Sequence, residues 1–368
     1  MHGWIILDKP LGLGSTQAVS AVKRNLRQAG FGKIKVGHGG TLDPLATGIL
    51  PIALGEATKL CGRMLDASKI YQFTLAFGTE TSGLDAEGDI VATSDHRPTR
   101  SAIAAVLPRF TGQIEQIPPA YSAIKIDGKR AYDRARAGED VEMKARSVTV
   151  YELQVVSVSP SLEDASADGP LNSVTFSAHV SKGTYIRSLA RDIAYAVGTV
   201  GHVTMLRRTR AGPFDLESAI SLDKLNAFGQ GAAQEDIILP IEAGLVDIPA
   251  LDLSPEQARA IQQGRVLTGI AMKDGLHWAR DAEMRPIALV ENIDDFEYVV
   301  TGSELEAFLL ESRLIKDLQP KYNLMLKHND LYPFIEVTLG EDFPRVLVSR
   351  RKDNPKSRYF GPFVGVSG

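Results

Sequence analysis

The sequence predicts an α+β protein, because it mixes segments with the spacing of strands and segments with the spacing of helices. Ser147 to Val158 is rich in valine and partly alternates between apolar and polar residues, as strands do. The segment Thr184 to Val197 has apolar residues at helical spacing, namely Ile186, Leu189, Ile193 and Val197. Strands with interspersed helices of this kind favour an α+β catalytic domain.

The other expected elements follow the same two patterns. A helix begins at Ser15 or Thr16, either of which can cap it, and ends at Gly30. Its apolar face carries Val19, Val22 and Leu26. The remaining expected strands, in chain order, are Trp4 to Leu7, Ile34 to Val36, Ile70 to Phe77, Asn172 to Val180 and His202 to Arg208. The polar, turn-rich stretch Ser159 to Leu171 predicts a loop insertion.

Length and composition indicate a soluble protein of two or three domains. The chain has 368 residues, of which 44% are hydrophobic and 23% charged. Its one cysteine, Cys61, excludes an internal disulfide framework and a cysteine-based zinc site within one chain. We expect a reducing compartment, most simply the cytoplasm. Neither a signal peptide nor an apolar run of membrane-spanning length is visible, so we expect no membrane partner.

The charge distribution favours local contacts with phosphates. The net charge of −4 argues against indiscriminate binding to polyanions. Residues 1–70 nevertheless hold nine lysines and arginines against four carboxylates. Two further basic groups are Arg207, Arg208 and Arg210, and Lys125, Lys129, Arg130, Arg134 and Arg136. Solvated helix faces are the alternative explanation for each group.

The segment GHGGTLDPLATG, Gly37 to Gly48, presents a single carboxylate, Asp43, between glycines and a proline. Glycines allow backbone angles closed to other residues, and Pro44 favours an extended conformation before it. We therefore expect a rigid, protruding loop. A carboxylate held in this way suits covalent or electrostatic chemistry at one carbon of a substrate. A glycine-rich turn with a solvated aspartate is the alternative.

This loop is part of a set of six sequence segments that follow one another along the chain. They are GWIILDKP from Gly3, GGTLDPLATGILPIALGEATK from Gly39, KIYQFTLAFGTETSGLDAEG from Lys69, PPAYSAIKIDGKRAYDRARAGE from Pro118, SKGTYIRSLARDI from Ser181 and HVTMLRRTRAGPF from His202. Together, over about Gly3 to Leu225, they resemble the TruB family of tRNA pseudouridine synthases.

This resemblance implies a fold and an activity. The fold is the pseudouridine-synthase fold, with a central antiparallel or mixed sheet flanked by helices. The activity is isomerisation of one uridine of the tRNA T-loop, at position 55, to pseudouridine. The expected partner is the T-stem-loop of tRNA, and we expect a monomer that uses no cofactor and no metal.

The resemblance also assigns the catalytic residues. Asp43 matches the family's catalytic aspartate, and Arg187 matches the arginine that pairs with it. An ionised aspartate in a closed pocket needs such a cation to stay charged. Tyr71 matches the aromatic residue that stacks on the uracil and is proposed to assist proton removal at C5. Glycoside hydrolases use two carboxylates, whereas an isomerase that excludes water can work with one.

Further residues are expected to bind the RNA. His38 matches the residue that fills the space vacated by flipped bases, and flipping costs roughly a few kcal/mol. Tyr185 matches a residue that touches the target base, and Leu206 matches an apolar wall of the pocket, although core packing explains Leu206 almost as well. For contacts with the RNA backbone we expect Lys9, Lys125 and Arg208.

The C-terminal third is organised differently. We expect the catalytic domain over 1–236 and a small domain over 237–291 that weakly resembles the family's RNA-binding domain, with a helix from Pro255 to Gln263. Residues 292–368 resemble the second half of a UvrC-type GIY-YIG nuclease domain. A helix from Ser303 ends at Pro320, Glu311 matches that family's metal-holding glutamate, and Asn323 matches a nearby asparagine. The half that activates the nucleophile is absent, so we expect this fused segment to be inactive.

Two other functions stay open at this point. The C-terminal segment would suit a structure-specific DNA endonuclease that nicks with Mg²⁺ or Mn²⁺ and needs Glu311. A non-catalytic RNA-binding protein could keep only the fold, although the presence of Asp43, Tyr71 and Arg187 argues against this. The sequence also leaves open whether the aspartate attacks C1′ or acts through a glycal.

Overall fold

The computed structural model divides into two compact units, Met1–Asn292 and Ile293–Gly368. None of the helices among the described residues combines the length and apolarity needed to cross a bilayer. The expected helix after Ser303, Glu311, Asn323 and most of the Ser159 to Leu171 loop lie outside the described residues. The structure describes residues 1–119, 121–122, 124–126, 129–131, 134, 143–160, 168–231, 237–263, 265, 267, 276–283, 286–291, 334–338, 345–349 and 356–360.

A nine-stranded sheet organises the described part of the first unit, which confirms the α+β prediction. The strand order is β1-β3-β12-β4-β11-β10-β7, with β2 paired to β3 and β13 to β12. All pairs are antiparallel except β3 with β12, so the sheet is mixed. The strands are β1 (Gly3–Lys9), β2 (Val36–His38), β3 (Ala46–Leu54), β4 (Lys69–Phe77), β7 (Gly112–Gln116), β10 (Arg146–Ser159), β11 (Ser173–Val180), β12 (Gly201–Ala211) and β13 (Phe214–Asp215).

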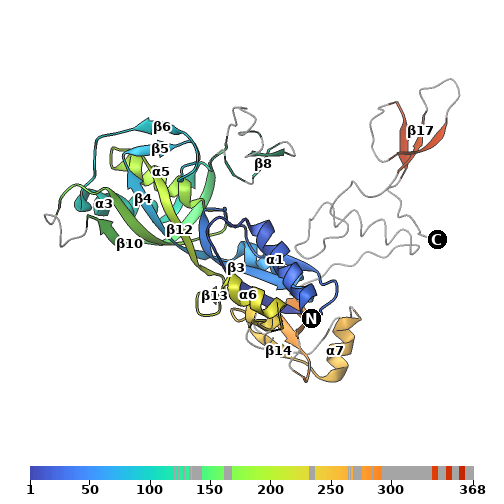
Figure 1. Ribbon diagram of the computed structural model, residues 1–368. Helices are drawn as coiled ribbons and strands as arrows, with labels where there is room; N and C mark the ends of the chain where they lie inside the picture. The colour runs from blue at the N-terminus through green and yellow to red at the C-terminus, as the bar shows by residue number, and fades with distance from the viewer. Residues whose placement is uncertain are drawn as a thin grey trace. The chain divides into compact units, whose positions relative to one another are not determined.

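Two groups of helices cover one face of this sheet (Figure 1). Helices α1 (Ser15–Gln28) and α6 (Leu222–Gly229) pack on the apolar residues of β1 and β3. Helix α5 (Ile186–Ala196) packs on β4 and β12. Tyr71 of β4 and Leu206 of β12 contact both apolar clusters. These two residues therefore mark the seam between the two helix groups, and the candidate site lies at this seam.

The smaller elements complete the two units. The first unit also contains α2 (Cys61–Asp66), α3 (Arg100–Val106), α7 (Pro255–Gln262), the hairpin of β5 (Thr79–Thr81) and β6 (Ile90–Thr93), and the hairpin of β8 (Lys125–Ile126) and β9 (Lys129–Arg130). A separate three-stranded sheet joins β14 (Ala250–Asp252), β15 (Leu276–Arg280) and β16 (Pro286–Glu291). The described part of the second unit is a sheet of β17 (Phe334–Val337), β18 (Val346–Ser349) and β19 (Arg358–Phe360).

Most expected elements are present within one or two residues of their predicted ends, but two boundaries differ. The cap of α1 is Gly14, neither Ser15 nor Thr16, because the Ser15 hydroxyl is engaged elsewhere. The Gln17 side chain instead accepts a hydrogen bond from the Gly14 N–H at 2.7 Å. Strand β2 begins at Val36 instead of Ile34 and extends to His38, which pairs with Ile52 of β3.

Gly48 is the position at which β3 can pass next to β12. Its φ is +97°, and a Cβ there would collide with the carbonyl oxygen of Arg208, its partner in the parallel register. We expect Gly48→Ala to lower the free energy of unfolding by more than about 2 kcal/mol, because strain and overpacking add. Urea unfolding measures this change.

Gly62→Ala is the matched control for Gly48→Ala. Gly62 lies in α2, is exposed, and no described atom lies within 4 Å of the Cβ position. That variant should be neutral or up to about 1 kcal/mol more stable, since alanine favours a helix. Equal effects of the two substitutions would contradict the account of the β3–β12 contact.

Candidate active site

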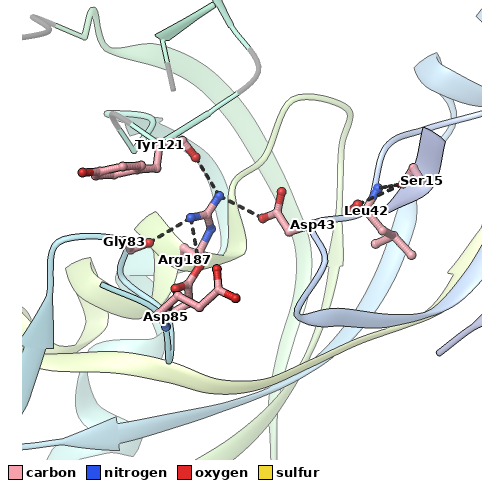
Figure 2. A network of polar contacts seen from close by, with 8 residues as sticks. Ser15, Leu42, Asp43, Gly83, Asp85, Tyr121 and Arg187 are labelled. Carbon is pink, nitrogen blue, oxygen red and sulfur yellow. Dashed lines mark hydrogen bonds and ion pairs between the residues drawn. The ribbon is translucent and has the colours of Figure 1, made fainter. Parts of the chain in front are cut away.

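Asp43 lies on the loop that connects β2 with β3, and its neighbours are fixed by side chains from elsewhere. The Ser15 hydroxyl accepts a hydrogen bond from the Leu42 N–H at 2.8 Å and donates to the Leu42 carbonyl at 2.9 Å (Figure 2). Leu42 is buried, whereas the Asp43 side chain is 46% exposed. The carboxylate is therefore held by a fixed backbone and is partly open to solvent. It is less enclosed than a carboxylate in a water-free pocket.

Arg187, the second residue of α5, binds this carboxylate. Its Nη2 donates to Asp43 Oδ2 at 2.8 Å and to the Tyr121 carbonyl at 2.9 Å. Its Nη1 donates to the Gly83 carbonyl at 2.8 Å and to Asp85 Oδ2 at 3.1 Å. The arginine side chain is only 8% exposed (Figure 2). The structure therefore brings together the expected pair, Asp43 from the β2–β3 loop and Arg187 from helix α5.

Asp85 is a member of this network that the sequence analysis missed. It follows Leu84, which has the left-handed φ of +59°, and the Asp85 carbonyl accepts from the Thr81 hydroxyl at 2.6 Å. Burial raises the pKa of the Asp85 carboxyl, while the Arg187 guanidinium lowers it. The sequence indicates Asp85 only through its place in GLDAEG, the last part of the family block that begins at Lys69.

Tyr71 and Leu206 lie beside this network on adjacent strands. The Tyr71 hydroxyl is 3.5 Å from Arg208 Nη1, and Tyr71 pairs with Arg208 in the β4–β12 register. Leu206 pairs with Phe73 in the same register and is partly buried. Both side chains contact the two apolar clusters, so core packing accounts for part of the burial of each.

Arg208 and Lys9, which are expected to contact the RNA backbone, are buried in the structure. Arg208 is 1% exposed, and its guanidinium donates to the carbonyls of Ile49 at 2.7 Å and Gly40 at 3.1 Å. Lys9 is 0% exposed, and its ammonium donates to the carbonyls of Pro10, Leu13 and Pro44. Carbonyls of the protein already occupy the positions at which phosphate oxygens would bind.

Three other residues are expected to bind the RNA. The structure describes the side chains of His38 and Tyr185 but not that of Lys125. His38 is half-buried at the end of β2, and burial followed by the nearby Arg208 lowers its pKa. Tyr185 caps α5, exchanges two hydrogen bonds with the Gln116 side chain, and has a phenol whose pKa burial raises. Lys125 lies in β8, but its side chain is outside the described part.

The Lys9 ammonium provides a pH-dependent test of its own burial. Burial, partly offset by Asp43, lowers the pKa of Lys9 from 10.5 to about 8. Between these two values the unfolded chain holds a proton that the folded chain lacks, so this group adds stability as the pH rises. The free energy of unfolding of the wild type, relative to Lys9→Met, should therefore rise from pH 8 to pH 10.5.

Urea unfolding of both proteins at several pH values measures this difference. Lys69, another buried lysine with a pKa lowered to about 8, is present in both proteins and cancels in the comparison. A difference that stays constant, or that falls across this range, would contradict the buried position of Lys9.

The fold defines the class of protein. Two solved structures resemble this chain over most of its length, a Cbf5-Nop10-Gar1 complex and an H/ACA RNP bound to a substrate RNA containing 2′-deoxyuridine. The first gives a TM-score of 0.59 and 28% identity, covering 82% of this chain and 84% of that chain. The second gives 0.58 and 25%, covering 82% and 84%. The architecture is that of the Cbf5 pseudouridine synthases.

The particular family follows from two family models and two related proteins that match this chain. Residues 24–186 match the TruB family pseudouridylate synthase N-terminal domain, and 187–246 match the tRNA pseudouridylate synthase B C-terminal domain. A protein from Novosphingobium aromaticivorans named tRNA pseudouridine synthase B is 66% identical over 83% of this chain and 98% of its own length. One of the same name from Zymomonas mobilis is 57% identical over 83% and 94%. The chain belongs to the TruB family and is a tRNA pseudouridine synthase.

The second resemblance is also confirmed at the level of the family. Residues 277–324 match the UvrC-like GIY-YIG domain. This match begins within the first unit, at β15, and continues into residues outside the described part. No structural account of a nuclease site follows from the described residues.

Proposed function

We propose that this enzyme converts the uridine at position 55 of the tRNA T-loop to pseudouridine in a reaction that depends on Asp43. The observation that carries this proposal is the 2.8 Å ion pair between the half-exposed Asp43 carboxylate and the buried Arg187. A buried arginine held by two carbonyls and a second carboxylate keeps its position when substrate enters. The acid it pairs with is therefore preorganised for the substrate.

The reaction requires a bond to be broken and another to be made at the same sugar carbon. The N1–C1′ bond breaks, the uracil turns within the pocket, C5 bonds to C1′, the hydrogen on C5 leaves as a proton, and N1, released from the sugar, takes up a proton. Asp43 either attacks C1′ covalently or removes a proton from C2′ to give a glycal. In both routes the carboxylate acts at the sugar, and the Arg187 guanidinium holds it in position.

The neighbours of Asp43 fit the handling of a flipped base. Tyr71 supplies an aromatic face at the seam between the helix groups, and stacking on such a face contributes roughly 1–3 kcal/mol per base. We assign Tyr71 to stacking and to proton removal at C5, and Tyr185 and Leu206 to the pocket wall. His38 takes the space left by the flipped bases, and Lys125 contacts the RNA backbone.

A T-stem-loop RNA with no modification tests the proposal. The enzyme is incubated with this RNA in excess EDTA, and pseudouridine is mapped by carbodiimide modification and primer extension. We expect conversion at position 55 alone, with chelator present, and none when that uridine is replaced by cytidine. Conversion at other uridines, or a requirement for a divalent metal, would contradict the proposal.

The C-terminal segment needs a separate assay. We propose that it contributes no nuclease activity, since residues 292–368 resemble only the second half of a GIY-YIG domain. Supercoiled and branched DNA should stay intact in Mg²⁺ or Mn²⁺. Nicking that disappears in Glu311→Ala would contradict this.

A further inference from the structure

One guanidinium ties the start of the Asp43 loop, at Gly40, to Ile49 of strand β3. Arg208 Nε donates to the Ile49 carbonyl at 2.7 Å, and Arg208 Nη2 donates to the Gly40 carbonyl at 3.1 Å. Gly40 and Ile49 stand on either side of Asp43 in the sequence. Since Arg208 is 1% exposed, these charge-assisted bonds are shielded from water and keep their full strength. The start of the loop is therefore fixed to β3 and β12.

A second side chain holds the same loop next to the carboxylate. The Ser15 hydroxyl bonds both to the N–H and to the carbonyl of Leu42, the residue directly before Asp43 (Figure 2). Ser15 is 5% exposed and comes from the first turn of α1. One hydroxyl thus satisfies a buried donor and a buried acceptor, which would be costly to leave without partners.

We infer that Ser15 and Arg208 are positioning residues for the chemical step, which act by fixing the backbone of the Asp43 loop and do not touch the RNA. This inference rests on the proposed role of Asp43. The Ser15 hydroxyl is turned to the Leu42 backbone, and the Arg208 guanidinium is turned to protein carbonyls and, at 3.5 Å, to the Tyr71 hydroxyl. In this inference, their effect on the reaction passes through the placement of the Asp43 loop.

A phosphate contact and a positioning role for Arg208 predict different effects on RNA affinity and on kcat. A phosphate contact lowers RNA affinity when it is lost and reduces the dependence of affinity on salt. A positioning residue leaves affinity and salt dependence unchanged and lowers kcat, because the carboxylate no longer meets the sugar in the reactive geometry. The same contrast applies to Ser15, which carries no charge.

The experiment compares Ser15→Ala and Arg208→Lys with two matched controls. Ser20→Ala removes an exposed hydroxyl of the same helix, which donates only to the Thr16 carbonyl among the described contacts. Arg97→Lys removes a guanidinium that donates to two backbone carbonyls, those of Ser94 and His96, between β6 and α3. For each protein we measure kcat and KM on T-stem-loop RNA, the salt dependence of RNA binding, and urea unfolding.

We expect kcat to fall roughly 10-fold to 100-fold in Ser15→Ala and Arg208→Lys, with KM within about two-fold of wild type. The salt dependence should not change, and both controls should keep the wild-type kcat. Rates are compared where unfolding curves show every variant to be folded. If Arg208→Lys is too unstable for this, Ser15→Ala alone decides, since it removes a single oxygen.

Three results would overturn the inference. They are an unchanged kcat in Ser15→Ala, a raised KM with a weaker salt dependence in Arg208→Lys, and a loss of rate that the controls share. Failure of the proposed function gives a different result, namely a wild-type enzyme that converts no uridine in the T-stem-loop. The two failures are therefore distinguishable in one set of assays.

Discussion

Asp43→Asn should lower the rate of pseudouridine formation by at least about 10⁴-fold while RNA binding changes little. Asparagine has nearly the same shape but no charge, so it can neither attack C1′ as a carboxylate nor remove a proton from C2′. Arg187 would keep its bonds to Asp85 and to the carbonyls of Gly83 and Tyr121. Single-turnover assays with enzyme in excess measure the chemical step, and filter binding measures the affinity.

The matched control for Asp43→Asn is Asp66→Asn. Asp66 is also an aspartate paired with a cation, Lys182, at 2.9 Å, but both side chains are more than 60% exposed. An exposed pair of this kind contributes at most about 1 kcal/mol, and the substitution should leave the rate unchanged. Turnover by Asp43→Asn within about ten-fold of wild type would contradict the assignment of Asp43.

Arg187→Met should affect both stability and rate. The Asp85 side chain is 17% exposed, and without the guanidinium its charge is left largely buried and without its main partner. Removing one member of a buried pair costs about 3–5 kcal/mol. The rate should fall by roughly 10³-fold or more, because Asp43 loses the cation that orients it.

A double variant separates these two effects. Adding Asp85→Asn to Arg187→Met removes the uncompensated charge, so much of the lost free energy of unfolding should return. The rate should stay low, since Asp43 still has no arginine. Recovery of both properties would show that Arg187 serves stability alone, and recovery of neither would contradict the account of Asp85.

Much of the fold followed from local patterns. The strands β1, β4, β10, β11 and β12 and the helices α5 and α7 lie where local patterns predicted them, because the apolar residues of each pack into buried clusters. The cap of α1 did not follow from propensity. The Ser15 hydroxyl would favour a capping position, but a tertiary contact with Leu42 takes it, and Gln17 provides the substitute.

In the candidate site, only the residues that match the family's motifs could be predicted from the sequence. The pairing of Asp43 with Arg187 followed from that resemblance. The burial of Lys9 and Arg208 could not be predicted, because a sequence shows their charge but not the carbonyls from distant loops that surround them. Asp85 was missed for the converse reason, since an aspartate in a segment bounded by glycines, such as GLDAEG, is typical of a solvated turn.

Release of tritium from C5 tests the central claim most directly. The T-stem-loop RNA carries [5-³H]uridine at position 55 and is held saturated with wild-type enzyme or with Asp43→Asn in EDTA. The account predicts release of one tritium per RNA by the wild type and none by the variant, although both bind the RNA. Release by Asp43→Asn at a rate near that of the wild type would contradict it.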